Sequence, residues 1–306
     1  MKGFLYMAIS KGQVSTEGEG FKRYIGVAPV NVIAVNPTKE ELSKIYNREI
    51  ENDPVYVKDV ESNGKTVRQV RVDFIVKTAD TCVDPVTGQH IDFTSRVTFF
   101  VNNDRRVSRT GKIQVIDKYG RTSWVTEEQL ATHAIPLSSK GTPLRISNDY
   151  RPVYNGEEDL TNFLKTFLNI PNPERYVNET WLPIEDQTVA EVRLDRISEY
   201  FNGNVSEIKE AINYQPNNKV KVLFGVKTGD DNKQFQAVYT QMVLRNSVND
   251  YSKLDADVQE RKQAGAYPTT EFEVVPLKEY VVKPTSFAQS SDNPSAIPPA
   301  FNPFMK

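Results

Sequence analysis

Cysteine and histidine are nearly absent from this chain of 306 residues, which has one cysteine and two histidines. The single cysteine, Cys82, excludes a disulfide within the chain, which is typical of a reducing compartment. Neither His90 nor His133 has a cysteine or an acidic residue at metal-ligand spacing, so we expect no metal site. The sequence also lacks a P-loop, a glycine-rich dinucleotide fingerprint and a Gly-x-Ser-x-Gly motif. We therefore predict a protein that is not an enzyme and needs no cofactor.

Long apolar runs and an excess of positive charge are missing too. No run approaches the roughly 18 apolar residues of a membrane span, and the first ten residues lack the apolar core of a signal peptide. We therefore expect a cytoplasmic protein without a membrane partner. The 38 basic residues against 40 acidic ones give a formal net charge of −2. Any nucleic-acid site must then be a local patch, because no global field attracts a polyanion.

Patterns typical of strands dominate the first part of the chain. Val-rich or alternating segments separated by turn residues predict strands at 21–35, 66–78, 90–101 and 122–125, and a strand pair within 106–116 that is broken at Gly111. Thr38 and Glu41 have the spacing of a capping box and predict a short helix after the first strand. Several short strands with regular turns are typical of a small barrel or sandwich.

Helical periodicity marks the middle of the chain. Asn155 is the expected N-cap of a helix whose apolar residues follow i, i+3, i+4, i+7, i+8 spacing: Leu160, Phe163, Leu164, Phe167 and Leu168. Further helices are expected at 189–201, 205–213 and 253–264. Strand patterns return at 219–228, 234–245 and 270–283. The Pro-, Ser- and Asn-rich segment 284–306 has no periodicity and predicts a disordered tail.

The most promising binding surface is the segment 105–124, in which basic residues face a single acidic one, Asp117. Single-strand binding needs cations that track the phosphates and flat rings that stack on unpaired bases. The expected phosphate contacts are Arg105, Arg106, Arg109, Lys112, Lys118 and Arg121, and the expected stacking residues are Tyr119 and Trp124. A solvated basic hairpin, with both rings in a core or turn, is an equally good interpretation.

A nuclease is a weaker alternative. Asp195 followed by Glu207-x-Lys209 has the order of a Mg²⁺-binding acid and a Glu-x-Lys pair. Glu207 falls in an expected helix, where a solvated charge pattern is the more common explanation.

Four segments carry a family resemblance: YIGVAPVNVIAVNPTKEELSKIY (24–46), GKIQVIDKYGRTSW (111–124), YRPVYNGEEDLTNFL (150–164) and VKVLFGVKTGDDNKQFQAVYT (220–240). They resemble the single-stranded DNA-binding proteins of crAss-like tailed bacteriophages. The resemblance implies an oligonucleotide-binding (OB) barrel and a role in phage DNA replication or recombination, in the cytoplasm of the bacterial host.

We accordingly predict an α+β protein with an OB-like β-barrel core in a domain of residues 1–283, a helical insertion at about 155–214 and a flexible tail at 284–306. The predicted function is non-catalytic binding of single-stranded DNA with little sequence preference. The apolar end of the tail is either inert or a docking peptide for replication proteins. A phage virion structural or assembly protein is the alternative function, because mixed β content and a near-neutral charge suit it equally well.

Overall fold

The computed structural model describes residues 22–62, 64–117, 121–138, 140–168, 174–177, 180–183, 197–214, 216–230 and 232–281. The helices are α1 (Lys39–Ile45), α2 (Glu127–Thr132), α3 (Glu157–Phe167), α4 (Ile197–Tyr200), α5 (Ser206–Tyr214) and α6 (Ser252–Gln263). The strands are β1 (Lys22–Val35), β2 (Val57–Ser62), β3 (Lys65–Thr78), β4 (Thr94–Asn102), β5 (Ile113–Ile116), β6 (Thr122–Val125), β7 (Arg151–Pro152), β8 (Glu174–Val177), β9 (Thr180–Pro183), β10 (Lys219–Thr228), β11 (Gln234–Arg245), β12 (Thr270–Phe272) and β13 (Lys278–Val281). The prediction of a mixed α+β protein is confirmed, with mostly antiparallel sheets.

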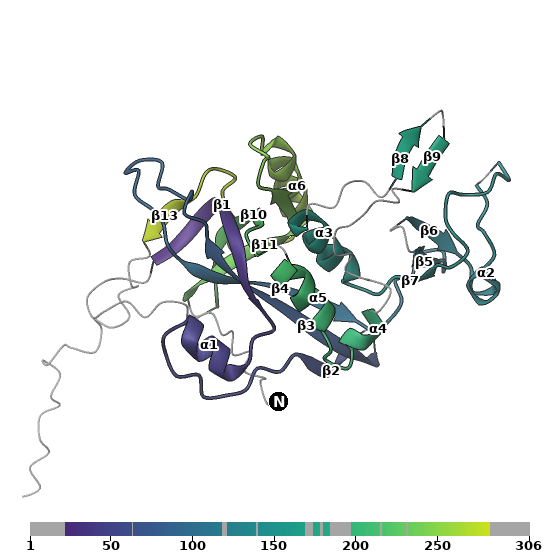
Figure 1. Ribbon diagram of the computed structural model, residues 1–306, viewed down its shortest axis with the longest axis horizontal. Coiled ribbons are helices and arrows are strands. Elements are labelled where there is room, and N and C mark those ends of the chain that lie inside the picture. The colour runs from purple at the N-terminus through teal and green to yellow at the C-terminus, as the bar shows by residue number, and fades with distance from the viewer. Residues whose placement is uncertain are drawn as a thin grey trace, which may run out of the picture.

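The main sheet is organised around β1, which changes partners along its length (Figure 1). Its first residues pair with β13, its middle with β10, and its last residues with β3. The strand bends at Gly26, whose φ is +126°. A Cβ at this position would lie 2.8 Å from the carbonyl oxygen of Val275, so only glycine allows the approach. The remaining neighbours give the order β11-β10-β1-β3-β4, with β2 beside β1 on the same edge of β3.

The hydrophobic core lies between the inner face of this sheet and helices α3, α4 and α5. Alternate residues of β3 and β4 point inward, among them Val72, Phe74 and Phe99. The ring of Phe163 in α3 packs 4.4 Å from that of Phe74. The apolar spacing that predicted α3 is confirmed, because all five of its periodic residues are buried.

The sheet curls, so that its edge strands β4 and β11 come close to each other. No ladder of backbone hydrogen bonds joins these two strands in the described part of the chain, and the predicted barrel is not closed there. The expectation that segment 155–214 is a helical insertion is also wrong in part, because the hairpin β8–β9 lies within it. Of the predicted helix 189–201, the structure describes the end as α4, and residues 189–196 lie outside the described ranges.

Several predicted boundaries differ from the structure for local reasons. Asn155 is not an N-cap: its side-chain amide donates to Asp104 Oδ2 at 2.6 Å, and Gly156 occupies the cap position of α3. The strand predicted at 90–101 begins at Thr94, and the last strand region is divided into β12 and β13 around residues 273–277. The capping box of α1 is confirmed, since Thr38 Oγ1 accepts from the amide of Glu41.

A second, three-stranded sheet of order β6-β5-β7 lies at the end of the molecule that carries α2 (Figure 1). Its buried face contributes Ile113, Val115 and Val125 to a small core completed by Ile146 and Tyr150. No helix in the described ranges is both long and apolar enough to cross a membrane. The predicted tail 284–306 lies outside the described residues, so the division from a domain ending at 283 stays a prediction.

Candidate nucleic-acid interface

The segment predicted to bind nucleic acid forms β5, β6 and the turns around them. Alternation along β6 buries Ser123 and Val125 and leaves Trp124 exposed, with 39% of its surface accessible. The ring of Trp124 therefore lies on the outer face of the three-stranded sheet, beside Gln114 of β5. Its exposure agrees with the predicted stacking role and argues against a core position.

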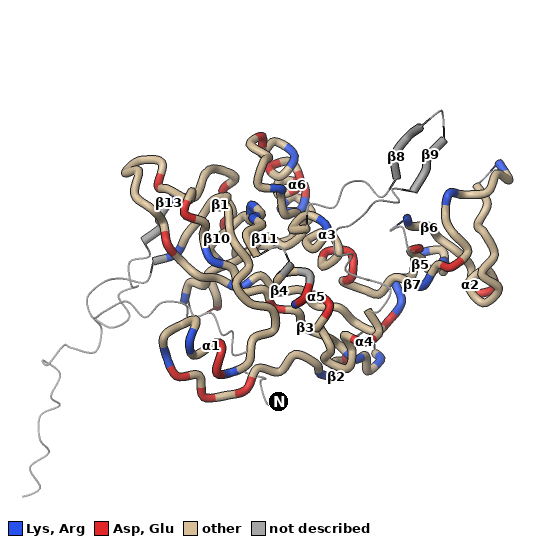
Figure 2. Tube along the Cα trace, viewed as in Figure 1, with Lys and Arg blue, Asp and Glu red and all other residues tan. Residues whose placement is uncertain are grey.

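Three of the predicted phosphate contacts form ion pairs. Arg105 pairs with Glu127 at 3.0 Å, and Arg106 pairs with Glu158. Arg121 Nη2 lies 2.6 Å from Asp117 Oδ2. Figure 2 shows the same mixture, with basic and acidic residues interspersed around β5–β7 and α2. These carboxylates reduce the local positive charge that the sequence suggested.

The other predicted residues divide into two groups. Arg109 and Lys112 are exposed in the turn before β5, and neither forms an ion pair with a residue that the structure describes. Lys118 and Tyr119 lie outside the described residues, so their predicted roles stay predictions. Among the described residues of this surface, Trp124, Arg109 and Lys112 are thus exposed and lie outside the ion pairs given above.

A second surface with the right chemistry lies on the outer face of β3 and β4. The register places Arg71 opposite Phe100 and Asp73 opposite Thr98. Phe100 follows the core residue Phe99 and points the other way, so 49% of its surface is exposed whereas Phe99 is buried. An exposed flat ring thus lies at the strand position that pairs with Arg71.

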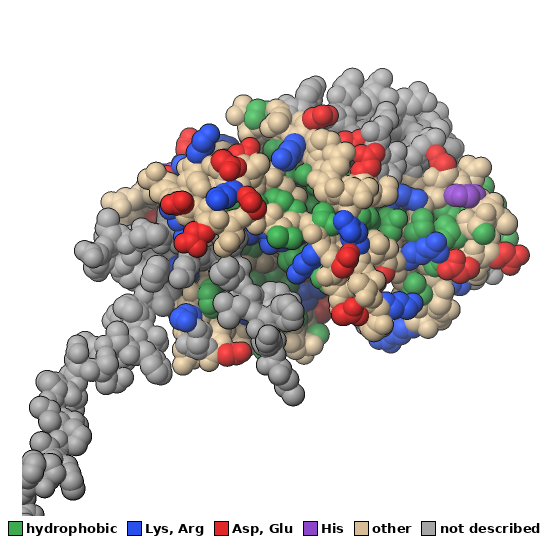
Figure 3. All heavy atoms as spheres, turned by 90° about the horizontal axis from the view of Figure 1, so that it is seen from below, with side chains coloured by type: hydrophobic (Ala, Val, Ile, Leu, Met, Phe, Trp, Pro, Cys, Tyr) green, Lys and Arg blue, Asp and Glu red, His purple; other side chains and the backbone are tan. Residues whose placement is uncertain are grey.

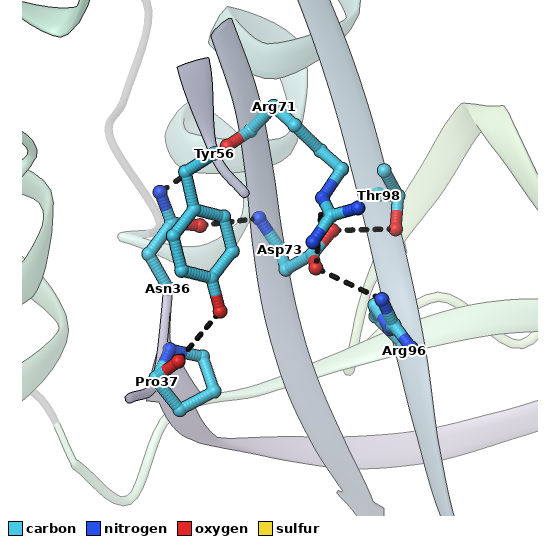
Figure 4. Close-up of polar contacts among 7 residues, drawn as sticks. All are labelled: Asn36, Pro37, Tyr56, Arg71, Asp73, Arg96 and Thr98. Atoms are coloured by element: carbon cyan, nitrogen blue, oxygen red, sulfur yellow. Dashed lines mark hydrogen bonds and ion pairs between the residues drawn. The ribbon is translucent and has the colours of Figure 1, made fainter. Parts of the chain in front are cut away.

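Asp73 organises the cations of this surface (Figure 4). Its side chain is 2% exposed, and Arg96 Nη1 donates to its Oδ2 at 3.0 Å. Arg71 Nε lies 3.2 Å from the same oxygen, and Thr98 Oγ1 donates to Oδ1 at 2.8 Å. Both guanidinium groups converge on one carboxylate, and both remain partly accessible, with side-chain exposures of 23% for Arg71 and 16% for Arg96.

The chain between β1 and β3 forms a wall beside these residues. Leu42 and Ile50 from this chain pack on Ile75, which lies on the same face of β3. The guanidinium carbon of Arg71 lies 5.1 Å from the ring centre of Tyr56, and the Tyr56 hydroxyl donates to the carbonyl oxygen of Pro37 at 2.6 Å. The wall therefore holds an aromatic ring against the guanidinium group of Arg71 in a cation–π contact.

A second tyrosine and a third arginine belong to the same neighbourhood. The guanidinium carbon of Arg48 lies 5.7 Å from the ring centre of Tyr46. Burial raises the pKa of the Tyr46 hydroxyl, Arg96 opposes that rise, and Asp73 adds to it. Burial also raises the pKa of Tyr56, so both phenols stay neutral. Three arginines and one aspartate give this cluster a formal charge of +2, which falls to +1 when Glu41, an acidic neighbour of Tyr56, is counted.

The sequence patterns did not identify Phe100, Asp73 or Arg96 as candidate site residues. A sequence signal for Phe100 did exist, because two consecutive phenylalanines in a half-buried strand must point to opposite faces. On the face seen in Figure 3, basic and acidic side chains are interspersed, with hydrophobic side chains exposed between them. A uniformly basic face is therefore not visible in that view.

The residues of the nuclease alternative can be located in part. Glu207 and Lys209 lie in α5, as predicted, and Asp195 lies outside the described residues. Among the described residues, no group of three or more His, Cys, Asp or Glu side chains is arranged to hold a metal ion.

Comparison with family models, with curated proteins and with solved structures found no match to this chain. The two surfaces that combine exposed aromatic rings with basic residues are therefore the candidate sites of this protein.

Proposed function

We propose that the protein binds single-stranded DNA non-covalently and with little sequence preference, over the outer face of β3 and β4. The observation that carries the proposal is the exposed ring of Phe100 beside Arg71, with Arg96 held close by. A ring that can stack on a base and cations that can meet the adjoining phosphates are the two components of a single-strand site. Neither component discriminates between bases.

The arrangement of the five longest strands supports the same proposal. In chain order they are β1, β3, β4, β10 and β11, and α3 lies between β4 and β10. β1 pairs with both β3 and β10, and the edge strands β4 and β11 approach each other. This is the order expected of an OB-fold, a partly open barrel that binds oligonucleotides on the face of its second and third strands. Those strands correspond to β3 and β4.

The biological setting is a further part of the proposal. The resemblance of four segments to single-stranded DNA-binding proteins of crAss-like phages is the reason for proposing a role in phage DNA replication or recombination, in the host cytoplasm. Lys and Arg side chains of the β5–β6 region, above all Arg109 and Lys112, would extend the contact together with Trp124.

Fluorescence anisotropy of a labelled oligo-dT strand tests the proposal. We expect binding at low salt, and the logarithm of the association constant should fall linearly with the logarithm of the salt concentration. Phe100→Ala should weaken binding by about 1–3 kcal/mol, the usual contribution of one stacked base. Val86→Ala, which truncates an apolar side chain that is 90% exposed in a loop, is the matched control and should leave affinity unchanged.

The same assay separates the two surfaces. If Trp124→Ala weakens binding and Phe100→Ala does not, the strand binds over the three-stranded sheet. Quenching of Trp124 fluorescence reports that contact directly, with Trp181 as the second tryptophan to be accounted for. Absence of binding by the unmodified protein at low salt would refute the proposed function.

A self-assembling virion protein is the second candidate, and one observation favours it. Residues 133–138 and 140–146 carry three exposed apolar side chains, Ile135, Leu137 and Leu144, with exposures of 45%, 58% and 38%. Exposed apolar side chains gathered in this way are typical of interaction sites. Sedimentation analysis decides between the candidates, because concentration-dependent assembly without affinity for DNA would support the structural role.

A further inference from the structure

A buried carboxylate in the middle of a cation site needs an explanation. Asp73 neutralises one positive charge of the surface proposed to meet phosphates, and it does so with its side chain almost fully removed from water. Burying an ion is unfavourable unless its partners are well placed. If positive charge alone determined binding, a neutral residue in place of Asp73 would make this face of β3 more attractive to phosphate.

The contacts of Asp73 show what its charge does. One oxygen lies against both Arg71 and Arg96, and the other accepts from Thr98. Its backbone amide donates to Asn36 Oδ1 at 2.7 Å, and Asn36 Nδ2 donates to the carbonyl oxygen of Arg71 at 3.2 Å. The carboxylate is therefore fixed from several directions, and it fixes two arginines that come from different strands.

Arg71 is held on a second side as well. Its guanidinium carbon lies over the ring of Tyr56, 5.1 Å from the ring centre, so the group is in contact with the aromatic wall as well as with Asp73. Its Nε lies 3.2 Å from Asp73 Oδ2 without the alignment of a hydrogen bond, so this contact is an ion pair and does not use the Nε–H as a hydrogen-bond donor. A guanidinium fork fixed in this way is suited to bind the paired oxygens of a phosphate.

We propose that Arg71 and Arg96 form a discrete anion subsite for one phosphate group of the bound strand, and that Asp73 is its positioning residue. This inference rests on the proposed function for the identity of the ligand. The phosphate binds beside the base that stacks on Phe100, because Phe100 and Arg71 are paired across the two strands. Asp73 does not touch the phosphate and acts through the two arginines.

The direction in which one substitution changes the affinity for DNA tests this inference. Asp73→Asn removes a negative charge, so simple attraction between charges predicts tighter binding of DNA. Positioning predicts the opposite, because the two guanidinium groups lose the anion that holds them together. We expect affinity for oligo-dT to fall by about tenfold or more, the usual effect of losing a charge-assisted contact.

Two further variants serve as controls. Asp92→Asn removes an exposed carboxylate that pairs with Lys77 of β3 at 3.3 Å, and it should leave affinity unchanged or raise it slightly. Arg96→Lys keeps the positive charge and removes the fork, and it should weaken binding in the same direction as Asp73→Asn. Circular dichroism and thermal melting establish whether each variant is folded. If Asp73→Asn does not fold, the inference is tested with Arg96→Lys.

A second measurement does not need DNA. Titration of inorganic phosphate, followed by NMR of the arginine Nε–Hε groups, should shift the signals of Arg71 and Arg96 in the unmodified protein but not in Asp73→Asn. If phosphate shifts these signals while oligo-dT does not bind, the anion subsite stands and the proposed function fails. Tighter binding of DNA by Asp73→Asn, or unchanged binding by both variants with no response to phosphate, overturns the inference.

Discussion

Two glutamates that each pair with an arginine allow a sharp test of how burial determines the contribution of an ion pair. Glu157, at the start of α3, is 1% exposed and accepts from both terminal nitrogens of Arg151, at 3.0 and 2.5 Å, and from the amide of Tyr154 at 3.0 Å. Glu127, at the start of α2, is 73% exposed and pairs with Arg105 at 3.0 Å. The same substitution, glutamate to glutamine, removes the charge from each.

The expected effects differ several-fold. Removing one partner of a buried pair destabilises a protein by about 3–5 kcal/mol, and glutamine at 157 keeps one acceptor, so we expect about 3 kcal/mol. An exposed pair contributes only about 0.2–1 kcal/mol. For a folded region of this size, 1 kcal/mol lowers Tm by roughly 2–4 °C. Glu157→Gln should then lower Tm by about 6–12 °C, and Glu127→Gln by no more than about 4 °C.

Urea denaturation followed by circular dichroism measures the free energy of unfolding of both variants and of the unmodified protein. Arg151 links β7 to α3, so the loss at Glu157 should also appear as faster amide exchange in the three-stranded sheet. If the free energies of the two variants lie within about 1 kcal/mol of each other, the exposure of the carboxylate does not decide its contribution and the reasoning is wrong.

Three more expectations concern other parts of the chain. Gly156→Ala should destabilise the protein far more than Gly111→Ala in urea denaturation, because both have positive φ but only at Gly156 would a Cβ lie 2.0 Å from the carbonyl oxygen of Phe100. Asp159→Asn should raise the free energy of unfolding near pH 7, because burial and Glu158 raise the pKa of Asp159 and make its ionised form unfavourable in the native state. This gain in stability should vanish as the pH falls through the ordinary carboxyl range, where Asp159 is protonated. A gain that persists at low pH would contradict this cause. Cys82 should resist a thiol reagent at mildly alkaline pH until the protein is unfolded, because burial raises the pKa of its thiol to about 11; rapid labelling of the native protein would show that the thiol is accessible.

The sequence predicted those elements whose signal is local. Alternation produced β3 and much of β4, and helical spacing produced the buried face of α3, because each pattern is a direct consequence of backbone periodicity. The short strand β7 could not be predicted in this way, since two residues carry no period. The N-cap assigned to Asn155 was wrong for a related reason: its side chain meets Asp104, which is 51 residues away in the chain.

The candidate site shows the same division more clearly. Basic residues are closely spaced along segment 105–121, and such spacing along the chain can be read directly from the sequence. The carboxylates that pair with Arg105 and Arg106 come from α2 and α3, so their effect depends on packing. Conversely, Asp73 and Arg96 are 23 residues apart and meet only through the register of β3 and β4. That register decides which charges gather around one carboxylate.

The way β1 changes partners has a consequence for how the protein is made. During synthesis β1 and β3 emerge early, but the strands that complete the sheet around β1, β10 and β13, follow only at residues 219–228 and 278–281. Contacts between such distant segments form slowly, and strands that wait for a partner have exposed backbone edges. A ribosome-bound chain that stops before β10 would therefore carry a half-finished sheet, and chaperones should bind it until the last strands arrive.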